Sequence, residues 1–193
     1  MREIKEYLID VGSILNTFPV EKINEIINKL IDAYRNNRQI FLFGNGGSAA
    51  TASHFACDLG KSTAMQNRKR FRVYSLADNI PLMTAWANDT DYEFIFSEQM
   101  ENFIENGDIA FALSGSGNSK NVLNALKLAK GKNIFTIGLT GYAGGKMKDL
   151  CDICLIVPSD NMQKIEDVHL VLCHVIFSRI RDRLSVNGSS IHR

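Results

Sequence analysis

The sequence carries almost no net charge and has no long apolar run. Its 193 residues hold 22 Lys and Arg against 21 Asp and Glu, a formal net charge of +1 at pH 7. Bulk charge therefore gives no reason to expect nucleic acid or an anionic membrane as a partner. No apolar segment approaches the ~20 residues that span a bilayer, and residues 1–6 lack the apolar core of a signal peptide. We therefore expect a soluble cytoplasmic protein of one domain.

Cysteine is scarce, and its spacing gives little support for a metal or disulfide framework. The four residues are Cys57, Cys151, Cys154 and Cys173. Cys151 and Cys154 form a C-x-x-C pattern, which can bind metal or carry out redox chemistry. The sequence holds no second C-x-x-C to complete a four-cysteine zinc site. The pair opens the apolar run 153–157, where a strand would point the two side chains to opposite faces. We therefore expect buried free thiols.

Helical and strand-like patterns alternate along the chain. Apolar residues recur with helical spacing in two segments within residues 1–36, which predicts an N-terminal pair of helices. Short, almost continuous apolar runs then alternate with helical patterns, which is typical of a parallel sheet covered on both faces. We expect strands at residues 39–43, 71–76, 108–113, 133–139 and 152–157, and helices at residues 49–59, 81–87, 94–104, 120–129, 144–150 and 162–184.

This alternation predicts the α/β class, as a doubly wound, flavodoxin-like three-layer sandwich with a five-stranded parallel sheet and an N-terminal helical pair. No linker, internal repeat or low-complexity segment divides the sequence. We expect one domain over residues 1–184, with helices in residues 1–36 and an α/β core in residues 39–184. The polar residues 185–193 are expected to form a frayed tail.

Two loops rich in glycine and serine each follow a predicted strand and precede a predicted helix. They are Gly44–Ser48 and Ser114–Ser119. Ligands of open parallel sheets bind beyond the carboxyl ends of the strands, and a helix N-terminus favours an anion. Glycine permits close backbone approach, and serine adds hydroxyl donors. The loops predict a site for a phosphorylated or polyhydroxylated small molecule, although Ser48 or Ser119 could instead cap its helix.

The first loop also allows a dinucleotide interpretation. Gly44–Ala49 matches the pattern G-x-G-x-x-G/A that follows the first strand of dinucleotide-binding folds. That pattern expects an acidic residue at the end of the next strand, roughly 20 residues on. The nearest candidate, Asp78, lies well past that distance, so the match is weak evidence. A Walker A loop is excluded because no G-K-[ST] follows.

Histidines and carboxylates recur on two of the predicted helices. His54 and Asp58 are spaced i, i+4 and share a face. Glu166 and His174 are eight residues apart, about 80° around a helix, so they can converge on one side. Two imidazoles and two carboxylates suit zinc or another first-row divalent ion. Spacing alone does not bring the two helices together. An ordinary i, i+4 residue pair on one helix and unrelated polar residues on the other would explain the same pattern. His169 faces elsewhere and is expected to be exposed or satisfied in the core.

Taken in order, several segments resemble the sugar isomerase (SIS) domain of phosphoheptose isomerases, over nearly the whole chain. The resemblance implies an aldose–ketose isomerase that converts sedoheptulose 7-phosphate to D-glycero-D-manno-heptose 7-phosphate through a cis-enediol, for lipopolysaccharide or capsule precursors. The segments that carry it are Gly44–Ala50, His54–Ala56, Thr84–Asp89, Ser116–Ser119, Leu139–Gly141, Gly144–Lys146, Val157–Ser159 and the helix with Glu166, His169 and His174.

The resemblance also implies roles for individual residues and an assembly. Asp58 and His174 occupy the positions of the catalytic base and its acid–base partner, although Glu166 is a second candidate for the base. A homotetramer whose sites take residues from more than one subunit is implied as well. The four zinc-ligand positions hold His54, Asp58, Glu166 and His174. The substrate-binding positions hold Asn45, Gly46, Gly47, Ser48, Asn88, Asp89, Ser114, Gly115, Ser116, Ser119 and Glu166.

Three positions depart from the family pattern. The family usually has Glu where this chain has the shorter Asp58, and Gln where it has Glu166. The extra carboxylate at Glu166 would neutralise a divalent ion fully, which favours firm binding over polarisation of the substrate. Gly115 stands where the family has a hydroxyl residue, so the loop loses one possible donor. These departures leave the reaction class in place and leave the choice of sugar open.

A second interpretation is a binding module. Some SIS proteins similar to phosphoheptose isomerases are non-enzymatic, and act as sugar-phosphate sensors or as partners of the replication initiator. Those proteins lack the histidine and acidic ligands. The presence of His54, Asp58 and His174 in this sequence favours an enzyme.

Overall fold

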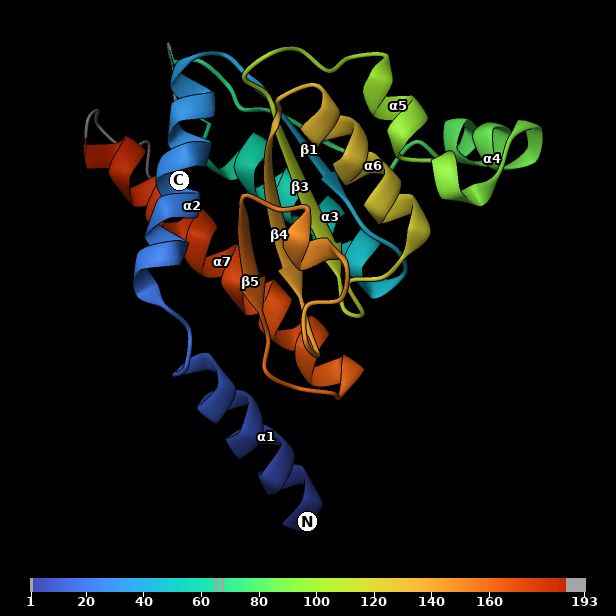
Figure 1. Cartoon of the computed structure of the whole chain (residues 1–193). Coiled ribbons are helices and arrows are strands. Elements are labelled where there is room, and N and C mark those ends of the chain that lie inside the picture. Colours follow the sequence, from blue (N-terminus) through green and yellow to red (C-terminus); the bar gives the residue numbers. More distant parts are fainter. Residues whose placement is uncertain (1, 65, 67, 187–193) are drawn as a thin grey trace.

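The computed structural model describes residues 2–64, 66 and 68–186. The chain forms five strands, seven α-helices and three short turns of other helix types in the described part (Figure 1). In chain order they are α1 (Arg2–Leu15), α2 (Val20–Arg35), β1 (Gln39–Phe43), α3 (Gly47–Cys57), the π-helical turn η1 (Asp58–Ser62), β2 (Arg72–Ser75), α4 (Ile80–Asp89), the 3₁₀ turn η2 (Tyr92–Phe94), α5 (Ser97–Glu101), β3 (Ile109–Ser114), α6 (Lys120–Gly131), β4 (Phe135–Thr140), the 3₁₀ turn η3 (Met147–Asp149), β5 (Ile153–Ile156) and α7 (Met162–Val186).

The five strands form one parallel sheet in the order β2-β1-β3-β4-β5. β1 and β3 are buried along their whole length, which explains their unbroken apolar sequences. The chain leaves β1 toward β2 on one side and later returns to β3 on the other. This reversal between β1 and β3 is the position at which open α/β sheets bind ligands. The predicted doubly wound sandwich with a five-stranded parallel sheet is confirmed.

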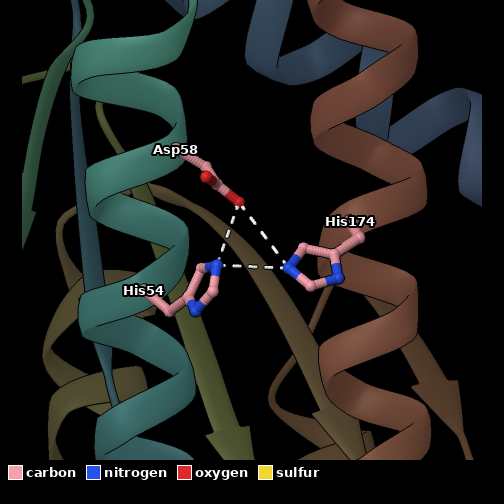
Figure 2. Close-up of side chains that lie close together, drawn as sticks. All are labelled: His54, Asp58 and His174. Carbon is pink, nitrogen blue, oxygen red and sulfur yellow. Dashed lines mark hydrogen bonds and ion pairs between the residues drawn. The ribbon is translucent and has the colours of Figure 1, made fainter.

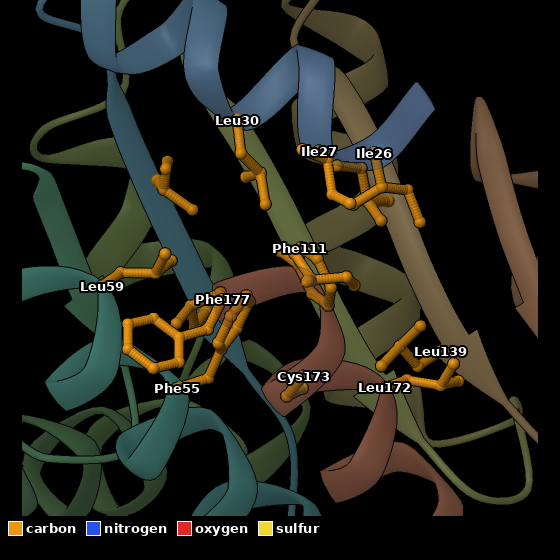
Figure 3. Close-up of a cluster of buried hydrophobic side chains, with 14 of the residues drawn as sticks. Ile26, Ile27, Leu30, Phe55, Leu59, Phe111, Leu139, Leu172, Cys173 and Phe177 are labelled. Carbon is orange, nitrogen blue, oxygen red and sulfur yellow. The ribbon is translucent and has the colours of Figure 1, made fainter. Parts of the chain in front are cut away.

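Two separate apolar clusters show that both faces of the sheet are covered. One cluster packs the sheet against α2, α3 and α7, and Figure 3 shows side chains of it, among them Leu30, Phe55, Phe111 and Leu172. The other contains Phe41 and Phe43, which point to the opposite face, and residues of α5 and α6. α3 and α7 therefore lie on the same face of the sheet, which the candidate site requires.

Some predicted elements differ from the observed ones. The helix expected at residues 94–104 is instead the turn η2 followed by α5, and the Ser97 hydroxyl donates to the Phe94 carbonyl at this break. The helix expected at residues 144–150 is the single turn η3, because Gly144 and Gly145 have φ of 87° and 55°, outside the right-handed helical region. α7 ends two residues beyond the expected 184, and residues 187–193 of the predicted tail lie outside the described part.

The C-x-x-C expectation is wrong in its geometry. Cys151 precedes β5, so the two residues do not alternate along one strand. Both sulfur atoms lie beside Gly138 of β4, where an added Cβ would be 2.7 Å from Cys151 Sγ and 3.4 Å from Cys154 Sγ. Both thiols are free, as expected, but they are partly rather than fully buried.

Two helices project from the body of the molecule (Figure 1). Every residue of α1 is at least partly exposed. Val11, Ile14 and Leu15 pack, partly buried, against the core. Two polar contacts also join α1 to α7: Tyr7 donates to Asp167 at 2.6 Å and Lys164 pairs with Asp10 at 2.6 Å. Every residue of α4 is likewise at least partly exposed. Within the described residues, no helix has both the length and the hydropathy to cross a membrane.

Candidate functional site

Three side chains from two helices converge on one point (Figure 2). His54 lies in the last turn of α3, Asp58 begins the π-helical turn that continues it, and His174 lies on α7. The two Nε2 atoms are 3.2 Å apart, and Asp58 Oδ2 is 3.5 Å from His54 Nε2 and 3.9 Å from His174 Nε2. The expectation that His54, Asp58 and His174 meet is therefore confirmed.

This arrangement fits a divalent metal ion. Ligand atoms around a tetrahedral zinc ion lie about 3.3 Å apart, since each bond is about 2.0–2.1 Å. Asp58 Oδ2 is buried and has no hydrogen-bond partner among the described residues, although a buried carboxylate oxygen requires one. The side chains of His54 and His174 are 50% and 46% exposed, so solvent and a small molecule reach the point where they meet. His54, Asp58 and His174 form a group that could bind a metal.

Packing between α3 and α7 holds the three side chains in place. Phe55 of α3 and Cys173 of α7 are buried in the same apolar cluster, and each is next in sequence to one of the converging histidines. Burial raises the pKa of the Cys173 thiol, and the neighbouring Asp58 carboxylate adds to the shift. Cys173 is therefore a neutral core residue. The apolar faces of the two helices fix the spacing of the polar groups on their other faces.

Glu166 lies apart from this group. It lies on α7, two turns before His174, and its carboxylate lies against Gly47 at the start of α3, where an added Cβ would collide with it. Gly47 therefore leaves room for this carboxylate. Glu166 is outside the set of ligand atoms that lie within 4.8 Å of one another, so its role as a fourth ligand stays a prediction.

His169 is buried, but the expectation that its ring would be satisfied in the core is not met. It is 1% exposed, and neither ring nitrogen has a hydrogen-bond partner among the described residues. Burial lowers its pKa to about 4, and the backbone of Thr140 offsets part of the shift. The ring is therefore neutral at pH 7 and lies apart from the His54, Asp58 and His174 group.

The first glycine-rich loop connects β1 to α3 and lies next to the second. Gly46 and Gly47 are exposed at the N-terminus of α3, whereas Ser48 is buried. The Asn45 side chain exchanges two hydrogen bonds with Asn121 of α6, at 2.9 and 2.8 Å. Because α6 follows the second loop, this pair brings the two loops together at the reversal of the sheet.

The second loop folds into a compact turn. Ser114 is buried, and its hydroxyl lies 3.4 Å from that of Ser119 and accepts from the Gly117 N–H at 3.2 Å. Gly117 has φ +63°, and an added Cβ would collide with the Gly144 carbonyl, so the turn requires glycine. The space that a side chain on Gly115 would occupy is filled by the sulfur of Met162.

The capping alternative does not explain the loop serines. Ser119 is at the N-cap position of α6 but makes no side-chain capping bond within the described residues. The N-cap residue of α3 is Gly46, so Ser48 lies inside the helix. The hydroxyl groups of the second loop therefore remain candidates for a ligand.

Ser116 lies in the second loop, where its hydroxyl accepts from the Asn118 N–H at 3.2 Å. The other predicted residues lie on α4. Asn88 and Asp89 are exposed at its C-terminal end, and Asn88 donates to Asp89 at 2.8 Å. Figure 1 shows that α4 projects from the body of the chain and lies away from α7. The structure brings these two residues to each other but not to the histidine pair.

Two residues at the loops were missed by the sequence analysis. Asn121 is 2% exposed and Tyr92 donates to Asn45 Oδ1 at 3.1 Å. A signal for Asn121 was available: it is a polar residue that shares a face of the predicted helix with Ala125 and Ala129, and buried polar groups need partners. Tyr92 gave no such signal, because it lies in a short turn with exposed neighbours.

Comparison with known proteins places these features in one family. The family model described as "SIS domain" matches residues 6–141. Phosphoheptose isomerase from Aliarcobacter butzleri is 39% identical over 187 residues, covering 94% of this chain and 97% of that protein. The enzyme from Helicobacter hepaticus is 38% identical over 168 residues, covering 87% and 85%. The structure of phosphoheptose isomerase from Neisseria gonorrhoeae superposes with a TM-score of 0.85 at 29% identity, covering 94% of this chain and 96% of that one.

Proposed function

This chain belongs to the phosphoheptose isomerase family of SIS-domain proteins, and we propose that it interconverts sedoheptulose 7-phosphate and D-glycero-D-manno-heptose 7-phosphate. The observation that carries the proposal is the convergence of His54, Asp58 and His174 from α7 and from the helical segment that follows the first loop. Relatives at this level of identity over most of their length support the same reaction.

The second loop binds the phosphate in this proposal. The hydroxyl groups of Ser114, Ser116 and Ser119, with backbone N–H groups of the loop, would donate to the phosphate oxygens at the start of α6. Gly115 contributes only its backbone groups to this site, since Met162 fills the space that a side chain would occupy. Binding the remote phosphate fixes the reacting carbons and lowers the entropic cost of reaction.

The first loop and α4 contact the sugar in this proposal. Asn45, Gly46 and Gly47 present donors at the N-terminus of α3, with Ser48 beside them, while Asn88 and Asp89 come from α4. The exposed glycines allow a hydroxylated chain to approach the backbone closely.

We propose zinc, or another divalent ion, at His54, Asp58 and His174, with Glu166 as a fourth ligand or a substrate contact. When bound, such an ion would polarise the carbonyl and hydroxyl oxygens of the sugar as a Lewis acid. The two imidazoles and the carboxylate match the ligands that zinc prefers.

Two residues transfer protons. The Asp58 carboxylate removes the proton from the carbon next to the ketose carbonyl and returns it to the former carbonyl carbon, through a cis-enediol. His174 moves a proton between the two oxygens, so that the atoms balance and no external reductant is needed. Its side chain is 46% exposed, so a substrate can reach it.

The test is turnover of sedoheptulose 7-phosphate together with exchange of its carbon-bound proton with heavy water. Asp58→Asn and His174→Gln are each expected to reduce turnover by at least ~100-fold, the usual contribution of a general acid or base. Asp32→Asn, at an exposed residue of α2, is the matched control. Unchanged turnover in both site variants would defeat the assignment. A panel of five- to seven-carbon ketose phosphates identifies the preferred sugar.

Metal content separates an enzyme from a binding module. We expect one divalent ion per chain by elemental analysis, lost on chelation and restored by zinc, with activity following it. His54→Ala should abolish binding of the divalent ion, because it removes one of the three converging ligands. Protein that binds the sugar phosphate without metal or turnover would instead favour a non-enzymatic module.

We further propose a homotetramer whose sites are shared between subunits. α1 exposes an apolar stripe, in which Ile4, Leu8 and Ile9 are each 64–66% exposed, and α4 has no fully buried residue. Large apolar side chains exposed in a row at helical spacing mark an association surface. Other copies of this chain are the occupants that we propose for both projecting helices.

A further inference from the structure

We propose that Asn121 and Tyr92 are positioning residues that hold the Asn45 side chain with a single N–H free to donate to a sugar oxygen. The proposal rests on the proposed function, in which Asn45 contacts the sugar. Its evidence is a three-residue hydrogen-bond network between the first loop, the turn η2 and the start of α6.

The orientation of the Asn121 amide follows from the backbone. The Val122 N–H can only donate, so the Asn121 atom 2.9 Å from Val122 N must be the oxygen. The other end of the amide is then its NH₂ group, which donates to Asn45 Oδ1 at 2.8 Å. Asn121 is 2% exposed, so water does not compete for these bonds.

Counting donors and acceptors fixes Asn45 as well. Its Oδ1 accepts from Asn121 Nδ2 at 2.8 Å and from the Tyr92 hydroxyl at 3.1 Å, which uses both lone pairs. Its Nδ2 donates one proton to Asn121 Oδ1 at 2.9 Å. One N–H remains, and Asn45 is only half-buried, so this donor is available to a ligand. Toward substrate, Asn45 can donate but not accept.

Tyr92 is held by contacts from α6. Its ring is 58% exposed, but the next residue, Glu93, pairs with Lys120 at 3.4 Å and accepts through its carbonyl from Asn124 at 3.1 Å. The same helix therefore positions both residues that orient Asn45. The start of α6, next to the second loop, thus couples the proposed phosphate site to the proposed sugar contact.

A donor fixed in advance serves this reaction. The sugar oxygens gain negative charge as the enediol forms, and a donor that needs no reorientation stabilises that charge more than the neutral ground state. Loss of the orientation should therefore lower kcat more than it raises KM. A rotated Asn45 amide would present its oxygen to the same charge and oppose the reaction.

The experiment compares Asn121→Asp and Tyr92→Phe with Asn45→Ala, using sedoheptulose 7-phosphate and the metal-loaded full chain. Asn121→Asp removes the donor to Asn45 Oδ1 but keeps the shape, and we expect kcat to fall about 10- to 100-fold with KM changed less than about threefold. Tyr92→Phe removes one hydroxyl group from an exposed side chain, so the chain should still fold. We expect it to lower kcat a few-fold, again with little change in KM.

Two controls match these changes. Gln99→Glu makes the same amide-to-acid exchange at a buried side chain that donates to the carbonyls of Leu76 and Ile95. Tyr74→Phe removes the hydroxyl of another half-exposed tyrosine, on β2. Both controls should leave kcat within about twofold, whatever they do to the melting temperature.

A double-mutant cycle decides the mechanism. In the Asn45→Ala background, Asn121→Asp and Tyr92→Phe should have no further effect on kcat, because they act through Asn45. Effects that persist in that background, or a kcat unchanged in both single variants, would overturn the proposal. If the wild-type chain turns over no sugar phosphate, the proposed function fails instead. Asn45 orientation is then judged by NMR, where Tyr92→Phe must shift the Asn45 side-chain amide signals and leave those of Gln99 unchanged.

Discussion

His169 is a titratable residue inside the apolar core. Its pKa is lowered to about 4, chiefly by burial, from an ordinary value of 6.5. Between those values the unfolded chain binds a proton that the folded chain does not, so folding stability decreases as the pH falls from about 6.5 toward 4. More than about one unit above pH 6.5 both states are neutral, and His169 adds no pH dependence there.

Replacing His169 should reduce the acid sensitivity of the fold. Between pH 7 and pH 5, the wild-type free energy of unfolding is expected to fall by about 2 kcal/mol more than that of His169→Leu. Urea unfolding of the metal-free chain at both pH values measures this difference. Equal slopes for the two proteins would mean that the folded chain protonates His169 as readily as the unfolded one.

Glu166 tests which carboxylate acts as the base. Its carboxylate lies against Gly47, outside the group of His54, Asp58 and His174. We therefore expect Glu166→Gln to retain turnover within about threefold, in contrast to Asp58→Asn. Glu25→Gln, an exposed substitution on α2, is the control. A loss in Glu166→Gln as large as that in Asp58→Asn would move the base to Glu166.

Sequence spacing predicted only part of the candidate site. His54 and Asp58 could be paired because a helix places i and i+4 on one face. The approach of His174 to them depends on how α3 packs on α7, and neither helix specifies that in its own sequence. The Asn45–Asn121 pair joins residues 76 positions apart, so it too requires the fold.

At the scale of elements, the strands were more predictable than the short helices. β1 and β3 are buried on both faces and therefore have unbroken apolar sequences that need no tertiary information. The segment 94–104 has an apolar helical pattern, yet Ile95, Phe96 and Met100 reach the core from a turn and a short helix. A helical spacing of apolar residues does not distinguish one continuous helix from a turn followed by a short helix, because both bury the same side chains.

α4 packs on the core only through the partly buried side chains of Met83, Trp86 and Ala87, so its cap contributes to its order. Asn79 accepts from the Leu82 N–H at 3.2 Å and caps the helix. Asn79→Ala should cost about 1 kcal/mol of helix stability. Because α4 carries Asn88 and Asp89, KM for the sugar phosphate should rise several-fold while the melting temperature changes little.

Asn79→Ser is the matched rescue, since serine caps nearly as well as asparagine. Steady-state kinetics and thermal unfolding of both variants measure the effect. A rise in KM that serine does not reverse would mean that Asn79 acts by a route other than capping. An unchanged KM in Asn79→Ala would argue against a substrate contact from α4.

At the scale of the whole molecule, the two projecting helices extend away from the core that the rest of the chain forms (Figure 1). α1 presents its apolar stripe outward, and Val20, at the start of α2, is also exposed, at 71%. Single exposed apolar residues are common, but a row of them on one helix is not. We propose that assembly buries this row and brings α4 of one copy to the His54, Asp58 and His174 group of another.

Mixing inactive variants tests that arrangement. If Asp58 and Asp89 serve one site from different copies, Asp58→Asn and Asp89→Asn chains, unfolded and refolded together in equal amounts, should restore about a quarter of the sites. Asp58→Asn mixed with His174→Gln is the matched control and should stay inactive, because these two residues meet within one chain at 3.9 Å. If the Asp58→Asn and Asp89→Asn mixture forms tetramers but regains no activity, Asp89 serves its own chain's site or none. With one variant uniformly labelled with ¹⁵N, native mass spectrometry of the mixture shows whether the subunits have exchanged, so the activity assay alone decides between a shared site and a site complete in each copy.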